Sequence, residues 1–265
     1  NWPRIPQCEP TEPIPEIDLI VVSGYLRNPA SFYGHLLINI ASNKQYLLDN
    51  SLNFGAIIPA DANPVSFIIN GVWGGYPALF STNMYIFTHN VYANRESRDA
   101  WSYRLRLSPA KRALLIAHLM ALIDQPVRYY FFNKNCAYYV ASALELVIDD
   151  DLITLPWAIP TDVVESLNQH NWLDPPRFLP AQRTRFNAHY TALTPDLKYY
   201  VKQYKKHNKP GTTAVYAHLP PDKKIQVIDT LLADTTQTPL LIDRLKLNGL
   251  GLATKQPDLH GTDAA

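Results

Sequence analysis

Cys136 is the residue of this sequence best placed for nucleophilic chemistry. It lies in the stretch FFNKNCAYYVASALELV (131–147), where an aromatic strand is predicted to end and a helix to begin. Asn133 or Asn135 can cap that helix, which puts the thiol beside unpaired backbone N–H groups and the positive end of the helix dipole. Such a position lowers the pKa of a thiol and favours the reactive thiolate. A small cysteine buried in the core fits the same pattern.

His35 is the predicted base for this thiol. It lies within the apolar run SFYGHLLINI, directly after Gly34, and a buried imidazole needs either a hydrogen-bond partner or a chemical role. A structural histidine with satisfied nitrogens is the alternative. The next predicted strand supplies Asn50, Ser51 and Asn53, and a side-chain carbonyl there can fix the imidazole tautomer as the third member of a triad. We select Asn53, although spacing alone does not separate it from Asn50.

Other kinds of site have weak support. No two histidines have the spacing of metal ligands, and no Lys-Ser or Lys-Thr pair follows the glycines of GVWGGYP, so neither a metal site nor a phosphate-binding loop is expected. The segment from Lys198 to Lys209 interleaves basic and aromatic residues, as sites for nucleic acid or lipid head groups do. A solvated helix face explains the same pattern. We therefore expect no cofactor and no nucleic acid.

The elements that would position these residues are predicted from periodicity and turn signals. The expected strands begin at Leu19 and cover 32–40, 44–54, 65–71, 84–92, 101–107 and 128–132, with 32–40 and 44–54 as an antiparallel hairpin. The expected helices cover 109–125, with Ser108 as the N-cap, then begin at Asn135 and near Thr161, and finally cover 194–207, 220–234 and 238–247. GVWGGYP is expected to be a loop. The chemistry would therefore lie in a strand-rich half, with helices after it.

Composition and charge limit the class of protein. With 47% hydrophobic and 18% charged residues, the chain is of a globular type, and it is long enough for a full core with an appendage. Its net charge of +1 creates no field that would select nucleic acid, an anionic membrane or an acidic substrate. No apolar run approaches the roughly 18 residues of a membrane span. Cys8 and Cys136, the two cysteines, can form at most one disulfide.

Six blocks in the first two thirds of the chain carry a family resemblance. They are SFYGHLLINI, LLDNSLNFGA, GVWGGYPALFST, RESRDAWSYRLRLS, YYFFNKNCAYYVASALE and IPTDVV. In this order, over about residues 18–170, they resemble the family of the lipoprotein N-acyltransferase Lnb N-terminal periplasmic domain. That family is similar in turn to permuted thiol enzymes of the NlpC/P60 and lecithin retinol acyltransferase kind, in which the histidine strand precedes the cysteine helix.

The resemblance implies a fold and a domain organisation. The implied fold is α+β and permuted papain-like (NlpC/P60-type), with an antiparallel sheet, a cysteine-bearing helix and a C-terminal helical region. Because prolines crowd the first residues, we expect an extended arm at 1–17. The thiol-enzyme domain is expected at 18–175 and the helical region at 176–265.

The resemblance also implies the residues of a substrate cleft. Its glycine-rich block falls on Gly71, Gly74 and Gly75, which would form a cleft wall where the backbone approaches substrate. Its charged block falls on Glu96, Arg98 and Asp99, for which a structural ion-pair network is the expected role. The predicted cleft residues are Asn50, Trp73, Gly74, Gly75, Tyr76 and Asn135.

The implied function is a cysteine acyltransferase. Cys136 would be the nucleophile and His35 its base, and a fatty acyl group of a lipoprotein or phospholipid would pass through an acyl-cysteine intermediate. The location would be the periplasm or the outer face of a bacterial inner membrane, after removal of a signal peptide, with a membrane surface as one partner. A cysteine peptidase or amidase of the cell envelope would use the same groups. A non-catalytic periplasmic binding module is the third reading, and the oligomeric state is open.

Overall fold

The chain divides into two compact units. The computed structural model describes residues 14–26, 31–41, 46–59, 61–153, 156–207, 212–235 and 237–249. The division falls between Ala181 and Gln182, and each unit has its own hydrophobic core. The predicted boundary at 175 is too early, because β7 (Arg177–Leu179) pairs with β5 (Ala100–Arg104) in the first unit. Most of the predicted arm at 1–17, including Cys8, lies outside the described residues.

The first unit is a mixed α+β structure built on an antiparallel sheet. Among the described residues the sheet has seven strands in the order β6-β4-β3-β2-β1-β5-β7. Besides β5 and β7, these are β1 (Glu16–Val22), β2 (His35–Ala41), β3 (Asn50–Ala56), β4 (Tyr76–Met84) and β6 (Val127–Tyr129). The predicted hairpin is confirmed, since β2 and β3 pair antiparallel. A 3₁₀ turn, η2 (Tyr46–Leu48), lies between them.

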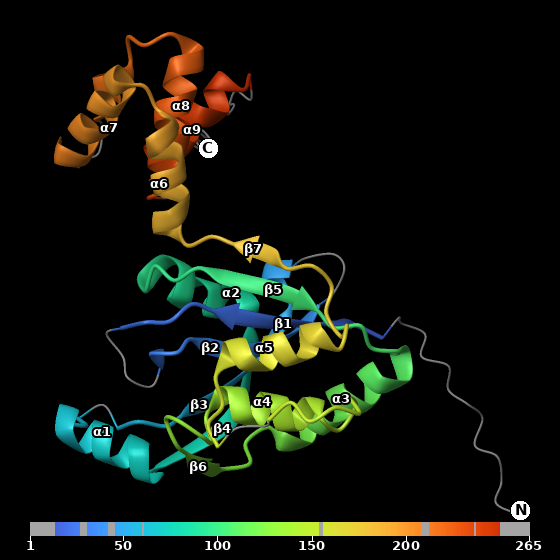
Figure 1. The fold of residues 1–265 in the computed structure, drawn as a ribbon. Coiled ribbons are helices and arrows are strands. Elements are labelled where there is room, and N and C mark those ends of the chain that lie inside the picture. Colours follow the sequence, from blue (N-terminus) through green and yellow to red (C-terminus); the bar gives the residue numbers. More distant parts are fainter. Residues whose placement is uncertain are drawn as a thin grey trace, which may run out of the picture. The chain divides into compact units, whose positions relative to one another are not determined.

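Each face of the sheet carries its own layer. The larger core lies under α3 (Pro109–Leu122), α4 (Cys136–Leu144) and α5 (Pro160–Gln169) (Figure 1). Alternate residues of β2 divide between the faces, because Leu36 and Ile38 join this core while Leu37 joins a smaller one. The smaller core includes Tyr85 of α2 (Tyr85–His89) and packs against Tyr92. The sheet is therefore buried on both sides around the start of β2.

The predicted strand at 65–71 is wrong, because this segment is the helix α1 (Pro64–Trp73). Asn63 caps the helix by accepting a hydrogen bond from the Ser66 N–H at 2.8 Å, and Pro64 occupies its first turn. The predicted loop GVWGGYP is also wrong in part. Its first three residues end α1, and Gly74 adopts φ 74°, the left-handed conformation that favours glycine after a helix.

The predicted strand at 84–92 is wrong as well. This segment forms α2 followed by η3 (Asn90–Arg95), a π-helical turn. Tyr85, Thr88 and Tyr92 recur with helical rather than strand spacing, and Tyr85 and Thr88 are buried. Short runs of aromatic and β-branched residues fit the helical period and the strand period alike. In this segment, packing onto the sheet favours the helix.

The predicted helix after Ser108 is confirmed by α3, whose Lys111 N–H donates to the Ser108 hydroxyl at 3.3 Å. The second unit is helical, as expected for the last part of the chain. Its elements are α6 (Gln182–Ala192), α7 (Pro195–His207), η4 (Thr212–Tyr216), α8 (Pro221–Leu232) and α9 (Thr238–Leu247). Leu197, Val201, Val227 and Leu231 belong to the core of this unit.

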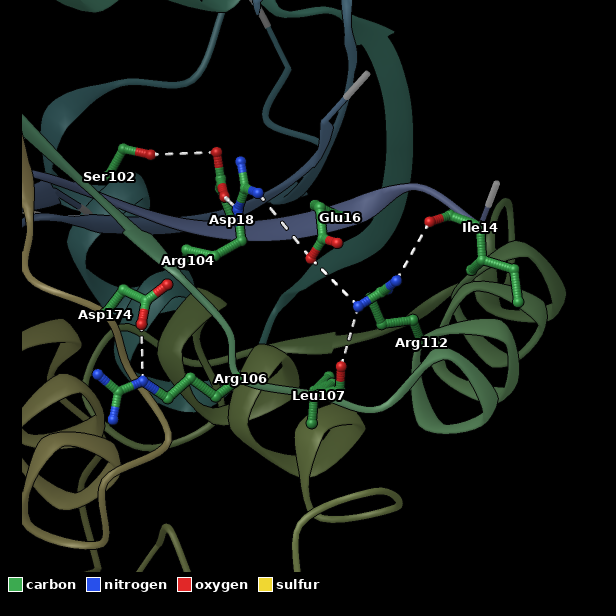
Figure 2. A network of polar contacts seen from close by, with 9 residues as sticks. All are labelled: Ile14, Glu16, Asp18, Ser102, Arg104, Arg106, Leu107, Arg112 and Asp174. Atoms are coloured by element: carbon green, nitrogen blue, oxygen red, sulfur yellow. Dashed lines mark hydrogen bonds and ion pairs between the residues drawn. The ribbon is translucent and has the colours of Figure 1, made fainter. Parts of the chain in front are cut away.

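A polar network ties β1 to its neighbours (Figure 2). The buried Asp18 carboxylate accepts hydrogen bonds from Arg104 and from the Ser102 hydroxyl of β5. Glu16 forms ion pairs with Arg104 at 3.9 Å and with Arg112 of α3 at 3.2 Å. Because the Asp18 carboxylate is buried, loss of its Arg104 partner would be costly, so this pair favours the observed register of β1 against β5.

Candidate active site

Asn135 fixes the point at which the cysteine helix begins. Its side-chain oxygen accepts hydrogen bonds from the backbone N–H groups of Ala137 at 3.0 Å and Tyr138 at 3.2 Å. These are two of the donors that a helix leaves unpaired in its first turn. Cys136 is the first residue of α4, and α4 packs on β2 and β3.

The loop before Cys136 is held just as tightly. The Asn135 amide donates to the Phe131 carbonyl at 3.1 Å and to the Ala158 carbonyl at 2.8 Å. The Phe131 N–H donates to the Gly71 carbonyl at 2.8 Å, and a Cβ on Gly71 would lie 2.1 Å from the Phe131 ring. Gly71 therefore allows the cysteine loop to approach α1. In the structure Gly71, the first glycine of the glycine-rich block, packs against Phe131 and is not seen as a cleft wall.

Burial dominates the electrostatics of the thiol. Cys136 is 3% exposed and belongs to the larger core. Burial raises its pKa to about 11, although hydrogen bonds from the backbone N–H groups of Leu36 and Ala137, and the charge of Arg98, act to lower it. The lowered thiol pKa expected from the helix start is therefore wrong for this structure, because desolvation of the thiolate exceeds the stabilisation by the helix terminus.

His35 is the first residue of β2 and enters it from a constrained turn. Gly34 has φ 104°, and a Cβ there would lie 2.6 Å from the Val22 carbonyl oxygen. Burial, followed by the charge of Arg98, lowers the pKa of His35 to about 4, while a hydrogen bond with Asn53 acts to raise it. The Nε2 atom is buried and has no hydrogen-bond partner among the described residues. At neutral pH the ring is therefore uncharged, as a general base must be.

The side chain of Asn53 is oriented by two hydroxyl groups. Its amide nitrogen donates to Thr88 Oγ1 at 3.2 Å and to Ser51 Oγ at 3.4 Å, and these two hydroxyls lie 3.2 Å apart. Because both hydrogen bonds are donated by the amide nitrogen, the amide oxygen is the atom that is available to His35. An oxygen at that position accepts from a ring N–H, which leaves the other ring nitrogen unprotonated.

Thr88 and Tyr92 are site residues that the sequence reasoning missed. Thr88 holds Asn53, and the Tyr92 ring lies 5.5 Å from the His35 ring, centroid to centroid. Their spacing with Tyr85 is the signal that could have found them, because i, i+3 and i+7 place three side chains on one helical face. The strand interpretation of 84–92 placed Tyr85 on the face opposite Thr88 and Tyr92.

The Cys136 thiol and the His35 imidazole are influenced by the same charged side chain, Arg98. The N–H of Leu36, the residue after His35, hydrogen bonds to the thiol. Arg98 lowers the pKa of both groups, and the pKa of Tyr92 is raised by burial and also by the charge of Cys136. The β2–β3 ladder pairs residues 38–40 with 50–52. The start of β2 thus lies beyond that ladder, where α4 brings Cys136.

A pocket of about 430 Å³ opens beside the imidazole. Its lining residues are His35, Asn53, Phe54, Gly55, Ala56, Ile57, Leu79, Ser81, Asn83, Phe87, Thr88, Val91 and Tyr92. The lining is mainly apolar, and its polar residues are His35, Asn53, Ser81, Asn83 and Thr88. Cys136 is not among these residues, so the thiol is closed off from the pocket in this structure.

The other predicted cleft residues do not gather at this pocket: Asn50, Trp73, Gly74, Gly75, Tyr76 and Asn135. Asn50 is exposed at the start of β3, and Trp73 is 77% exposed at the end of α1. A Cβ on Gly74 would lie 2.3 Å from the Tyr130 ring, and one on Gly75 would lie 2.5 Å from Asn70. Tyr76 is buried in the larger core. Gly74, Gly75 and Tyr76 serve packing and Asn135 caps α4, which sequence spacing does not distinguish from a cleft.

The charged block is structural in part. Arg98 forms an ion pair with Glu96 at 2.9 Å, and Asp99 accepts a hydrogen bond from the Ala181 N–H at 2.7 Å. No group of three or more His, Cys, Asp or Glu side chains that could hold a metal ion occurs within the described ranges.

Comparison with known families decides the relationship. The family model of the Lnb N-terminal periplasmic domain matches residues 11–170. The chain belongs to that family. Its matched domain is periplasmic, and it contains the whole His35–Asn53–Cys136 region. No curated protein and no solved structure matches the chain. No helix in the described part of the chain is long and apolar enough to cross a membrane.

Proposed function

We propose that this domain transfers acyl groups through Cys136. The observation that carries the proposal is a thiol at a capped helix start that accepts a hydrogen bond from the N–H of Leu36, the residue that follows the neutral imidazole of His35. In the first step, the Cys136 sulfur bonds to an ester carbonyl carbon while its proton passes to His35. The ester C–O bond then breaks, and the alcohol leaves with that proton.

The second step returns the thiol. An amine or water attacks the thioester carbonyl, His35 takes the proton of the attacking group, and the Cys136 sulfur leaves and is reprotonated. Because both groups are neutral at pH 7, attack is coupled to proton transfer and does not begin from a stored thiolate–imidazolium pair. Asn53 and Thr88 orient the base throughout.

Charge on the carbonyl oxygen needs donors close to the sulfur. The Cys136 backbone N–H is one donor. It donates to the Tyr129 hydroxyl oxygen, which places that hydroxyl beside it as the second donor. Tyr129 is buried and its pKa is raised by burial, so the hydroxyl keeps its proton and can donate to an oxyanion.

The architecture supports a permuted papain-like fold of the NlpC/P60 kind. A histidine strand precedes a cysteine helix that packs on an antiparallel sheet. The substrate class is inferred from the family and from the pocket, where Ile57, Leu79 and Phe87 offer an apolar wall to a fatty acyl chain. An acyl-bearing lipid or lipoprotein at a membrane surface is the proposed donor.

A non-catalytic binding module is the second candidate. The observation that favours it is the buried Cys136 thiol, which does not line the pocket. A peptidase or amidase would use the same groups as the transferase and differs only in the bond that is cleaved.

Product analysis separates these functions. The protein is incubated with a diacyl lipopeptide and phospholipid vesicles, and the products are identified by mass spectrometry. An N-acylated lipopeptide identifies the transferase, free fatty acid a hydrolase, and a shortened peptide a peptidase. Cys136→Ser serves as the control. Products that persist in Cys136→Ser, or binding without any product, contradict the proposal.

A further inference from the structure

Tyr92 contacts both the Arg98 guanidinium and the His35 imidazole beside the pocket. The Arg98 Cζ lies 4.9 Å from the centroid of the Tyr92 ring, and that centroid lies 5.5 Å from the centroid of the His35 ring. Tyr92 belongs to η3, a π-helical turn, and π turns occur often at functional sites. Tyr92 and His35 both line the 430 Å³ pocket, whereas Arg98 is not among its lining residues.

The Arg98 guanidinium is buried and held in place by hydrogen bonds. It is 2% exposed, its Nε donates to the Ser23 carbonyl at 2.7 Å, and its Nη1 pairs with Glu96 at 2.9 Å. Its Nη2 is buried and has no hydrogen-bond partner within the described residues. A buried arginine with an unsatisfied donor carries a desolvation cost. Glu96 is 26% exposed, so an ion pair with it could form without burying the Arg98 guanidinium. The pair therefore does not explain why this cation is buried.

We propose that Arg98, held against Tyr92, is a positioning residue that keeps His35 a proton acceptor below neutral pH. This inference rests on the proposed function for its purpose, and on the contacts of Tyr92 with Arg98 and His35 for its geometry. A buried cation disfavours a second positive charge on the nearby imidazole, because little water is present to screen the two charges.

The groups around the imidazole act on its pKa in both directions. Among the described residues, Arg98 is the charged group that lowers the pKa of His35, because it disfavours the protonated ring. Tyr92 from η3 and Cys136 from α4 keep their protons at neutral pH because burial raises the pKa of both. Asn53 from β3 is uncharged, and its hydrogen bond favours the protonated ring. Glu96 is paired with Arg98, so it reduces the effect of that cation.

The test is an NMR titration of the full chain labelled at histidine. The His35 signals are assigned by their loss in His35→Gln. In the double variant Arg98→Met/Glu96→Gln, which removes both members of the ion pair, the His35 midpoint is expected to rise by roughly one pH unit. Arg98→Lys keeps the charge and is expected to keep the midpoint near that of the unmodified chain. An unchanged midpoint in the folded double variant overturns the inference.

A single substitution with the opposite expected effect on the His35 midpoint tests the inference even if the double variant fails to fold. Glu96→Gln leaves Arg98 unneutralised, so the His35 midpoint is expected to fall, and a rise overturns the inference. The acid limb of Cys136 acylation should move with the midpoint in each variant, which a merely structural Arg98 would not produce. The titration needs no turnover. A chain that never acylates Cys136 therefore contradicts the proposed function, and the midpoint still decides the electrostatic role of Arg98.

Discussion

At the residue scale, burial outweighs every charge around His35 and Cys136. It moves the two pKa values in opposite directions, so that both groups are neutral over the physiological range. The hydrogen bonds at the start of α4 and the Arg98 cation act on the thiol in the direction expected of a nucleophile, but they are smaller than the desolvation cost. Closure of the site over the thiol is therefore the main control on its reactivity.

His35 should make the protein less stable in acid. The unfolded ring has a pKa of 6.5 and the folded ring about 4, so between these values the unfolded state binds a proton that the folded state does not. Stability therefore falls as pH falls through 6.5 toward 4, by roughly 3 kcal/mol in all. His35→Gln should remove this component from the free energy of unfolding, measured with urea at pH 7 and pH 4.5, whereas His118→Gln on α3 should keep it. Equal pH dependence in His35→Gln and the unmodified chain would show that the ring is not desolvated.

Asn53 should matter more than Asn50. Asn53→Ala removes the group that orients the imidazole, so acylation of Cys136 should slow about tenfold, less than the 10²- to 10⁴-fold loss expected for His35→Ala. Asn50→Ala, an exposed change at the start of the same strand, should leave the rate unchanged. Stopped-time mass spectrometry gives the rates. A larger loss for Asn50→Ala than for Asn53→Ala would reverse the assignment.

At the element scale, the sequence identifies the central hairpin and the helices that begin after Ser108 and Asn135, and it misses α1, α2 and η3. Ser108 with Pro109, and Asn135 before Cys136, are start signals whose geometry is local, so α3 and α4 could be predicted. Asn63 with Pro64 is a start signal of the same kind, but the β-branched and aromatic residues at 64–73, like those at 85–95, also fit a strand. That error hid Thr88 and Tyr92, because the strand alternation gave no reason to group them with Tyr85.

Gly71 tests the contact between α1 and the cysteine loop. A Cβ at this position would lie 2.1 Å from the Phe131 ring, whereas a Cβ on Gly55 would have nothing within 4 Å. Gly71→Ala should therefore reduce the free energy of unfolding by about 3 kcal/mol, and Gly55→Ala should change it by about 0.5 kcal/mol or less. Urea denaturation followed by fluorescence measures both. Similar stabilities for the two variants would mean that the loop does not rest on α1.

At the scale of the whole molecule, each unit has a core of its own. The helical composition after about residue 180 predicts the second unit, but the place of β7 could not be predicted, because three residues of an edge strand carry almost no pattern. The site lies entirely in the first unit, within the matched family domain. The role of the second unit is thus separable from the chemistry.

The two cores should respond independently to mutation. Leu231→Ala empties a fully buried position of the second core and should cost about 3 kcal/mol there. Hydrogen exchange should accelerate in α7, α8 and α9 and stay unchanged in α4. The matched change Leu115→Ala in the first core should do the reverse. Faster exchange throughout both units in either variant would show that they unfold together.

The central claim is that Cys136 carries an acyl group during turnover. The most direct measurement is intact-mass and peptide mass spectrometry of the protein, incubated with phospholipid vesicles without an amine acceptor and quenched in acid. We expect one fatty acyl thioester on Cys136, released by neutral hydroxylamine, absent in Cys136→Ser and at least 10²-fold slower to form in His35→Ala. An unmodified Cys136 in folded protein, or an acyl group on any other residue, would contradict the account.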